Sequence, residues 1–203
     1  MVLLRLPRGA VAARAFVPDE LQSSLSSPLS ALMCVEYDEA PCGPYRELLF
    51  IPGAMLFPDG RRHPSISRIL VSTWESVVNG RANWGIPKDR ADFFFESVPG
   101  GDRIRLADDS HEFCRLEFGP CRGPRLPLAT SLVPSRLTRL AQLHEGRVFH
   151  YAPEARGSLR FCRLHDWWFD ARWFPDLSVA RVLACARVEQ FEMTFPVARV
   201  TNA

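Results

Sequence analysis

Lysine is almost absent from this chain. The sequence has 25 lysine and arginine residues, and only one of them, Lys88, is a lysine. Arginine makes ion pairs at least as well as lysine, but it keeps its proton and therefore cannot attack a carbonyl group as a free amine. Two interpretations are open. Either a bias toward arginine has left one ordinary surface lysine, or the chain needs an amine at position 88.

Further absences exclude whole classes of protein. No apolar run approaches the roughly 18 residues of a membrane-spanning helix. The net charge is only +2 and the arginines are scattered, so the basic surface typical of nucleic-acid-binding proteins is missing. We therefore expect neither a membrane nor a nucleic acid as a partner. The length predicts one domain over residues 1–203, and the 47% hydrophobic content allows a sizeable core.

Metal-binding and disulfide patterns are also missing. The six cysteines include no CxxC pair, and the five histidines show neither HxxxH nor HExxH spacing. We therefore predict free thiols in a reducing compartment, the cytoplasm, and neither a metal nor another cofactor. The N-terminal segment has no acidic residue before Asp19, as in transit peptides, but we interpret it as part of the fold.

Proline and glycine, by contrast, are frequent, with 17 and 12 residues. They divide the chain into short pieces, which favours strands and turns over long helices. Alternation of apolar and polar residues predicts strands near 103–106, 113–118 and 190–195. A short helix is expected to begin near 18–21, and a short helix followed by a strand is expected within 175–188. The expected fold class is α+β, predominantly antiparallel β, with the strands closed or nearly closed into a β-barrel and a few short helices.

The segment WGIPKDR contains the single lysine directly after a proline, which fixes the backbone before the amine. The upstream pair Asn79-Gly80 is interpreted as a turn, and Trp84 and Ile86 are apolar neighbours. If the Lys88 amine lies on the same side of the chain as these two residues, it is shielded from water. Burial penalises the ammonium form of a lysine and can lower its pKa by roughly 3–5 units. A neutral amine condenses with a ketone to an imine, whose protonated form supports decarboxylation, aldol addition or dehydration.

Two short patterns resemble a known family. Residues 80–81 and 87–88 form G-R-x5-P-K, which resembles the catalytic signature of the acetoacetate decarboxylases. Residues 45–47 are similar to the Tyr-x-Glu segment that carries the family's active-site glutamate. Segments 172–177 and 192–196 are similar in kind to the closing part of the family. The resemblance therefore covers most of the chain and is specific at the first two patterns.

The resemblance implies decarboxylation of a small β-keto acid, acetoacetate-like, through a Schiff base on Lys88. Glu47 would position the substrate or handle protons near the imine. Arg81, Tyr45 and Trp84 are the predicted substrate-binding residues, and Arg81 is also expected to hold the loop through backbone or carboxylate contacts. The family further implies a barrel-like acetoacetate-decarboxylase fold, a homo-oligomer and no metal.

The chain departs from the family at three points. It is shorter than the decarboxylases and so resembles a compact member of the family. The decarboxylases have a second lysine directly after the catalytic one, where this chain has Asp89. On an extended backbone, however, neighbouring side chains point to opposite faces. The family also has an active-site arginine near its N-terminus, for which Arg5, Arg8 and Arg14 are the candidates here.

Alternatives to the decarboxylase interpretation stay open. The same iminium chemistry would serve another Schiff-base lyase, an aldolase or dehydratase acting on a keto acid. A non-catalytic small-molecule-binding barrel would keep the fold without the reaction. For Glu47 the alternative is a buried acid paired with Arg46 or Arg81.

Overall fold

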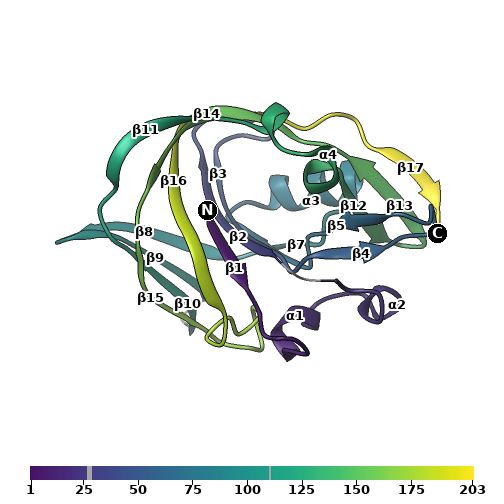
Figure 1. The fold of residues 1–203 in the computed structure, drawn as a ribbon, viewed down its shortest axis with the longest axis horizontal. Helices are drawn as coiled ribbons and strands as arrows, with labels where there is room; N and C mark the ends of the chain where they lie inside the picture. Colours follow the sequence, from purple (N-terminus) through teal and green to yellow (C-terminus); the bar gives the residue numbers. More distant parts are fainter. Residues whose placement is uncertain (27–28, 110) are drawn as a thin grey trace.

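The protein is described by a computed structural model over residues 1–26, 29–109 and 111–203. In this part of the chain most regular structure is β-strand, and the strand pairs are antiparallel except for β6 with β7. Figure 1 shows curved sheets, with β1 at the N-terminus running between β16 and β2. The α+β class, predominantly antiparallel β, is confirmed.

The described strands form four sheets. The largest has the order β11 (Arg122–Ala129), β14 (Glu154–Phe161), β16 (Arg181–Thr194), β1 (Val2–Arg5), β2 (Ser30–Tyr37), β3 (Tyr45–Ile51), β6 (Arg68–Val71) and β7 (Lys88–Arg90). The second has the order β15 (Leu164–Phe169), β10 (His111–Phe118), β9 (Gly101–Asp108) and β8 (Asp92–Val98). The third has the order β12 (Leu140–His144), β13 (Arg147–Tyr151) and β17 (Arg199–Asn202), and β4 (Ala54–Leu56) pairs with β5 (Arg62–Pro64). The helices are α1 (Val11–Arg14), α2 (Asp19–Gln22), α3 (Trp74–Trp84) and α4 (Ser135–Thr138), with a 3₁₀ turn at η1 (Thr130–Leu132).

Several local predictions are confirmed. The three predicted strands lie in β9, β10 and β16, and the helix expected near 18–21 is α2. All six cysteines are free thiols. Within the described residues, no pairing joins β11 to β7, the outer strands of the largest sheet. Closure into a barrel therefore stays a prediction.

The pair Asn79-Gly80 was predicted to form a turn, and this prediction is wrong because both residues lie inside α3. Capping interactions at both ends of α3 determine where the helix begins and ends. The Thr73 side chain accepts a hydrogen bond from the Ser76 amide, and Gly85 ends the helix in the left-handed conformation with φ 60°. These caps outweigh the turn preference of a single Asn-Gly pair.

Within 175–188 a short helix followed by a strand was predicted; the strand is confirmed by β16, and the helix is wrong. The segment enters β16 at Arg181 without a helix among its described residues. β16 lies between β14 and β1 and pairs with both, so sheet pairing on both edges decides its conformation.

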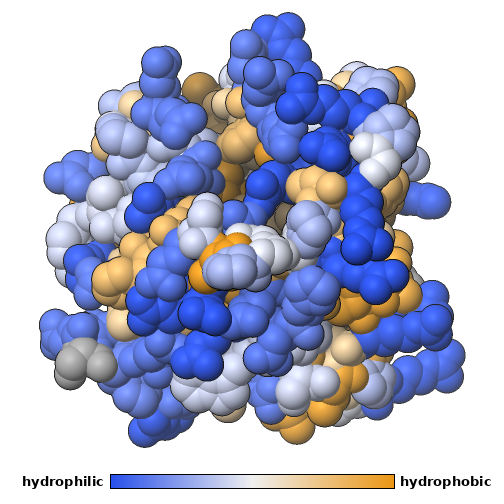
Figure 2. Space-filling view, turned by 90° about the vertical axis from the view of Figure 1, so that its left-hand side faces the viewer, coloured by the Kyte–Doolittle hydropathy of each residue, from blue (hydrophilic) through white to orange (hydrophobic). Residues whose placement is uncertain are grey.

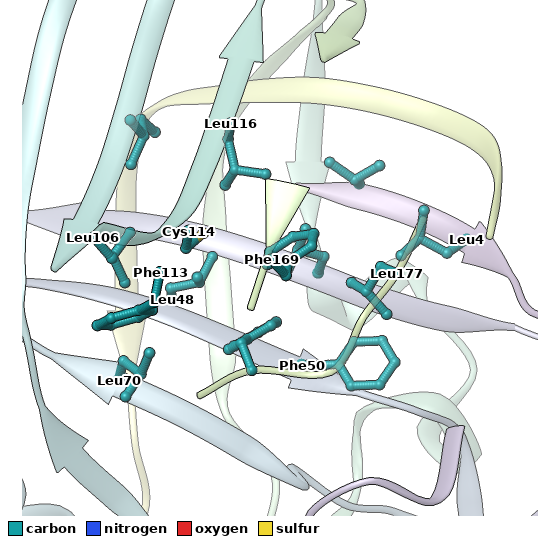
Figure 3. Packing of buried hydrophobic residues seen from close by; sticks show 14 of the residues in the cluster. Leu4, Leu48, Phe50, Leu70, Leu106, Phe113, Cys114, Leu116, Phe169 and Leu177 are labelled. Atoms are coloured by element: carbon teal, nitrogen blue, oxygen red, sulfur yellow. The ribbon is translucent and has the colours of Figure 1, made fainter. Parts of the chain in front are cut away.

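The main hydrophobic core lies between the largest sheet and the second sheet. Figure 3 shows side chains from β1, β3 and β6 meeting side chains from β9, β10 and β15. Leu48 and Phe50 on β3 are fully buried in this core. Because side chains alternate along a strand, Glu47 and Leu49 point to the opposite face, where a second apolar cluster contains Leu49. The second face carries the candidate site.

The surface is mostly polar on the side where β11 and β8 lie in Figure 1. Figure 2 shows this side as largely hydrophilic, with hydrophobic residues in separate patches. Among the described residues, none of the helices has the length and apolar composition needed to cross a bilayer.

Gly85, which ends α3 shortly before Lys88, allows a test of the packing at this end of the helix. A Cβ atom there would lie 2.5 Å from Cδ2 of Phe149, which is 2% exposed. Gly146 has a similar φ of 69° but open space around it. We expect Gly146→Ala to lower the free energy of unfolding by about 1–2 kcal/mol through backbone strain alone. Gly85→Ala should cost about 1–3 kcal/mol more because it overpacks the core. Urea unfolding measures both, and equal losses would contradict the packing described here.

Candidate active site

Lys88 and Glu47 are brought to one face of the largest sheet by its strand register. Glu47 on β3 lies opposite Val71 on β6, and Lys88 on β7 lies opposite Ile69 on β6. Side chains alternate along strands, so all four point to the same side. Helix α3 connects β6 to β7, as a parallel pair requires, and buries Val77 in the apolar cluster on that side.

The amine of Lys88 is buried among polar and aromatic groups. Lys88 is 6% exposed and Glu47 is 3% exposed. The Lys88 Nζ atom lies 3.1 Å from Glu47 Oε2 and donates a hydrogen bond to Ser76 Oγ at 3.0 Å. It also lies 4.9 Å from the centre of the Tyr45 ring. A buried amine with a carboxylate and a hydroxyl at hydrogen-bond distance has both a counter-charge and a partner for proton transfer.

Helix α3 passes close to the lysine at Gly80. A Cβ atom at this position would lie 2.5 Å from Lys88 Cδ and 2.7 Å from Cε. Glycine is unfavourable in a helix interior by roughly 1 kcal/mol relative to alanine. Its presence in α3 is therefore explained by the space that the Lys88 side chain needs.

Arg81 holds the backbone of the lysine rather than its amine. Its Nε atom donates to the Lys88 carbonyl oxygen at 2.9 Å, and its guanidinium pairs with Asp89 Oδ1 at 2.6 Å. Asp89 also pairs with Arg68. The carboxylate that follows the lysine is thus engaged by two arginines, and the contacts expected of Arg81 with backbone and carboxylate are present.

The alternative pairing considered for Glu47 is not found. Arg46 pairs with Glu36 at 2.7 Å, and Arg81 pairs with Asp89 at 2.6 Å. The partner of Glu47 is Lys88. Glu47 is therefore a buried acid, as that alternative held, but its partner is the single lysine of the chain.

Two tyrosines stand beside this pair. Tyr37 on β2 lies opposite Tyr45 on β3, with ring centres 4.6 Å apart. Burial raises the pKa of Tyr45 well above its ordinary value, and the nearby Glu47 carboxylate raises it further. Burial likewise raises the pKa of Tyr37, again with Glu47 as the next cause. Both phenols therefore stay protonated and able to donate hydrogen bonds across the neutral pH range.

A surface hollow of about 320 Å³ opens beside the tyrosines. It is lined by two acidic residues and one basic residue among others: Glu36, Tyr37, Asp38, Pro44, Tyr45, Arg46 and Ser72. Tyr45 lines this hollow and also turns its ring face to the Lys88 amine. The volume is within the range of small-molecule sites, roughly 300–1,000 Å³.

Trp84, at the C-terminal end of α3, packs against the same apolar cluster as Tyr45. The Trp84 ring packs on Phe195 at 5.4 Å, and its Nε1 atom donates to the Pro196 carbonyl oxygen at 2.8 Å. Its described contacts thus tie α3 to the C-terminal segment. The candidates for an N-terminal arginine, Arg5, Arg8 and Arg14, are all exposed.

Sequence reasoning missed Ser76 and Tyr37. Ser76 lies in the first turn of α3, and the signal for that helix was Thr73 followed by the acidic Glu75. Tyr37 is one of only three tyrosines, and it is separated from Tyr45 by a turn-rich segment that predicts a hairpin. A hairpin register would have placed the two tyrosines opposite each other.

Comparison with known sequences gives a partial match. No family model matches the chain. The rice protein NEOXANTHIN-DEFICIENT 1, from Oryza sativa subsp. japonica, is 34% identical over 86 residues. That segment is 41% of this chain and 28% of the rice protein, so the similarity spans well under two thirds of the rice protein's length.

Comparison with solved structures covers the whole chain. Acetoacetate decarboxylase from Legionella pneumophila has a TM-score of 0.67 at 14% identity, over 98% of this chain and 82% of that one. An acetoacetate decarboxylase-like enzyme from Sphingomonas wittichii RW1 has a TM-score of 0.64 at 12% identity, over 100% and 89%. The enduracididine biosynthesis enzyme MppR has a TM-score of 0.64 at 17% identity, over 99% and 85%. The chain therefore has the acetoacetate decarboxylase-like fold that the sequence patterns implied.

The tyrosines allow a test by pH. Burial raises the pKa of all three, Tyr37, Tyr45 and Tyr151. The folded protein keeps its phenol protons near pH 10, where the unfolded chain loses them. The contribution of the buried phenols to the free energy of unfolding is therefore complete below about pH 10 and is lost as the pH rises further. We expect phenolate absorbance to be absent from the native protein at about pH 10.5 and to appear on unfolding in urea. Native tyrosines that titrate near pH 10 would contradict the burial of the site.

Proposed function

We propose that the protein is a lyase that decarboxylates a small β-keto acid through a Schiff base on Lys88. One observation carries the proposal. The single lysine of the chain is buried, with its Nζ atom 3.1 Å from the Oε2 atom of a buried carboxylate, Glu47. The acetoacetate decarboxylase-like fold supports it.

The reaction begins with transfer of a proton from the Lys88 ammonium to a base. Glu47 is the carboxylate at the right distance for that transfer. The Lys88 nitrogen then attacks the keto carbon, water leaves, and a protonated imine forms. The electron pair of the bond to the carboxyl carbon moves into the iminium, which releases carbon dioxide and leaves an enamine. Protonation of the enamine carbon and hydrolysis return the ketone and the free amine.

The surroundings of the amine fit the charges of these steps. An iminium is cationic, and both Glu47 and the face of the Tyr45 ring stabilise a cation at the position of Nζ. Ser76 Oγ is placed to bond the nitrogen or the departing water. The neutral phenols of Tyr37 and Tyr45 can donate hydrogen bonds to the substrate carboxylate.

A second candidate uses the same imine for aldol or dehydration chemistry on a keto acid. The observation in its favour is the similarity to MppR, which has been solved with pyruvate and with the condensation product of pyruvate and imidazole 4-carboxaldehyde. The two candidates share Lys88 and differ in what the pocket places next to the iminium. A non-catalytic small-molecule-binding protein is the third possibility, and it predicts no covalent adduct.

Other expectations from the sequence belong to this proposal. They are closure of the strands into a barrel, assembly as a homo-oligomer, location in the cytoplasm and a reaction without a cofactor. Arg81 enters as the residue that fixes the backbone of Lys88, and Trp84 as a residue that holds α3 against the C-terminal segment.

Borohydride trapping tests the proposal. The protein is incubated with acetoacetate or pyruvate, reduced, digested and analysed by mass spectrometry. We expect a reduced adduct on Lys88, the only lysine side chain present. Lys88→Arg keeps the charge and should lose both adduct and turnover. Glu47→Gln should lower the turnover rate by about 10²–10⁴ if Glu47 moves the proton.

The reaction products distinguish the decarboxylase from the aldolase or dehydratase. Release of carbon dioxide together with the adduct supports decarboxylation, and an adduct without carbon dioxide supports the aldolase or dehydratase. If Lys88→Arg turns substrate over at the wild-type rate, or if a bound keto acid gives no adduct, both enzyme assignments are wrong.

A further inference from the structure

A second group of reactive side chains lies away from Lys88, at the end of the molecule where β4, β5 and β13 gather (Figure 1). It consists of Asp59, His63 and His150. Asp59 lies in the turn between β4 and β5, His63 lies on β5, and His150 lies on β13. No metal-binding pattern is visible in the sequence, because His150 is distant along the chain from the other two residues.

The three side chains converge. One ligand-type atom from each lies within 4.8 Å of the other two. His63 Nε2 and Asp59 Oδ2 are 2.8 Å apart, and the two imidazole centres are 5.2 Å apart with the rings 72° from parallel. Ligand atoms around a tetrahedral zinc ion, bound at 2.0–2.2 Å, are about 3.3–3.6 Å apart. Side-chain movements of at most about 1.5 Å would therefore close the group on an ion.

The surroundings hold the two imidazoles in place. Phe57 is 2% exposed, and its ring meets both His63, at 5.8 Å between centres, and His150, at 6.5 Å. The Asp59 carboxylate is oriented by the Arg61 amide, which donates to Oδ1 at 2.9 Å and leaves Oδ2 toward the histidines. Backbone and packing therefore fix all three side chains before any ligand binds.

We propose that Asp59, His63 and His150 bind a divalent transition-metal ion, with Zn²⁺ as the best match. Two imidazole nitrogens and one carboxylate oxygen form a ligand set that zinc accepts readily, and three protein ligands leave one coordination position for water. The Asp59 residue is exposed, so an ion can reach the group from solvent. The bound ion joins the β4–β5 turn to β13 and thereby stabilises this end of the fold.

The zinc site is independent of the proposed imine chemistry. Side chains alternate along β13, and Tyr151 packs in the apolar cluster near Lys88 whereas Val148 packs with Phe57 on the other side. His150 shares the side of Val148. Failure of one proposal therefore leaves the other untouched.

Metal titration of the full, untagged chain tests the proposal. After the protein has been treated with chelator and dialysed, ZnCl₂ is added and followed by calorimetry and thermal unfolding. We expect one Zn²⁺ to bind per chain and to raise the midpoint of unfolding. His63→Ala and His150→Ala should each weaken binding by at least about tenfold and abolish the thermal shift. Asp59→Asn, at an exposed position, gives a third variant that keeps the shape of the side chain.

His111→Ala is the matched control. His111 lies 3.3 Å from Asp170, but no described ligand group of three includes it. Its removal should leave zinc binding unchanged. The visible spectrum of bound Co²⁺ should show nitrogen and oxygen ligands without thiolate charge transfer. The proposal is overturned if the wild type does not bind zinc, if the His63 and His150 variants bind it like the wild type, or if thiolate bands show that cysteines hold the metal.

Discussion

The pairing of one buried amine with one buried carboxylate is the interaction on which the arrangement of the site depends. Lys88 Nζ and Glu47 Oε2 are 3.1 Å apart, and both side chains are largely excluded from water. Removing one member of such a pair leaves an uncompensated buried charge, which typically costs about 3–5 kcal/mol. A pair of this kind adds little to stability compared with apolar residues of similar size. Its presence at the only lysine of the chain is what the proposed imine chemistry requires.

The fold builds this pair from a parallel βαβ unit set into an otherwise antiparallel sheet. β6, α3 and β7 place Lys88 two strands from β3, and the register places Glu47 on the same face, so the two side chains meet over β6. Gly80 makes room for the lysine side chain, and Arg81 fixes its carbonyl oxygen. The Glu47 charge also acts on the neighbouring tyrosines by raising their pKa values. One carboxylate thus contacts the buried amine and keeps the neighbouring phenols protonated, which are the two features that the proposed function uses.

The sequence predicts the parts of this site that depend on short patterns. Lys88 and Glu47 were found because each lies in a motif of a few residues, and strands such as β9 were found because alternation is a local signal. Helix α3 was missed because its caps, rather than its Asn-Gly interior, determine it. Ser76 and His150 could not be placed, because their neighbours come from distant strands and only the tertiary register brings them together. Barrel closure likewise depends on pairings between distant strands.

A double-mutant cycle on the buried pair tests the central claim most directly. The free energy of unfolding in urea is measured for the wild type, Lys88→Met, Glu47→Gln and the double variant. We predict that each single change lowers stability by about 3–5 kcal/mol. The double variant should lose less than the sum of the two by at least about 1 kcal/mol. Small, additive effects would show that the two side chains are solvated and independent, and would contradict the site described here.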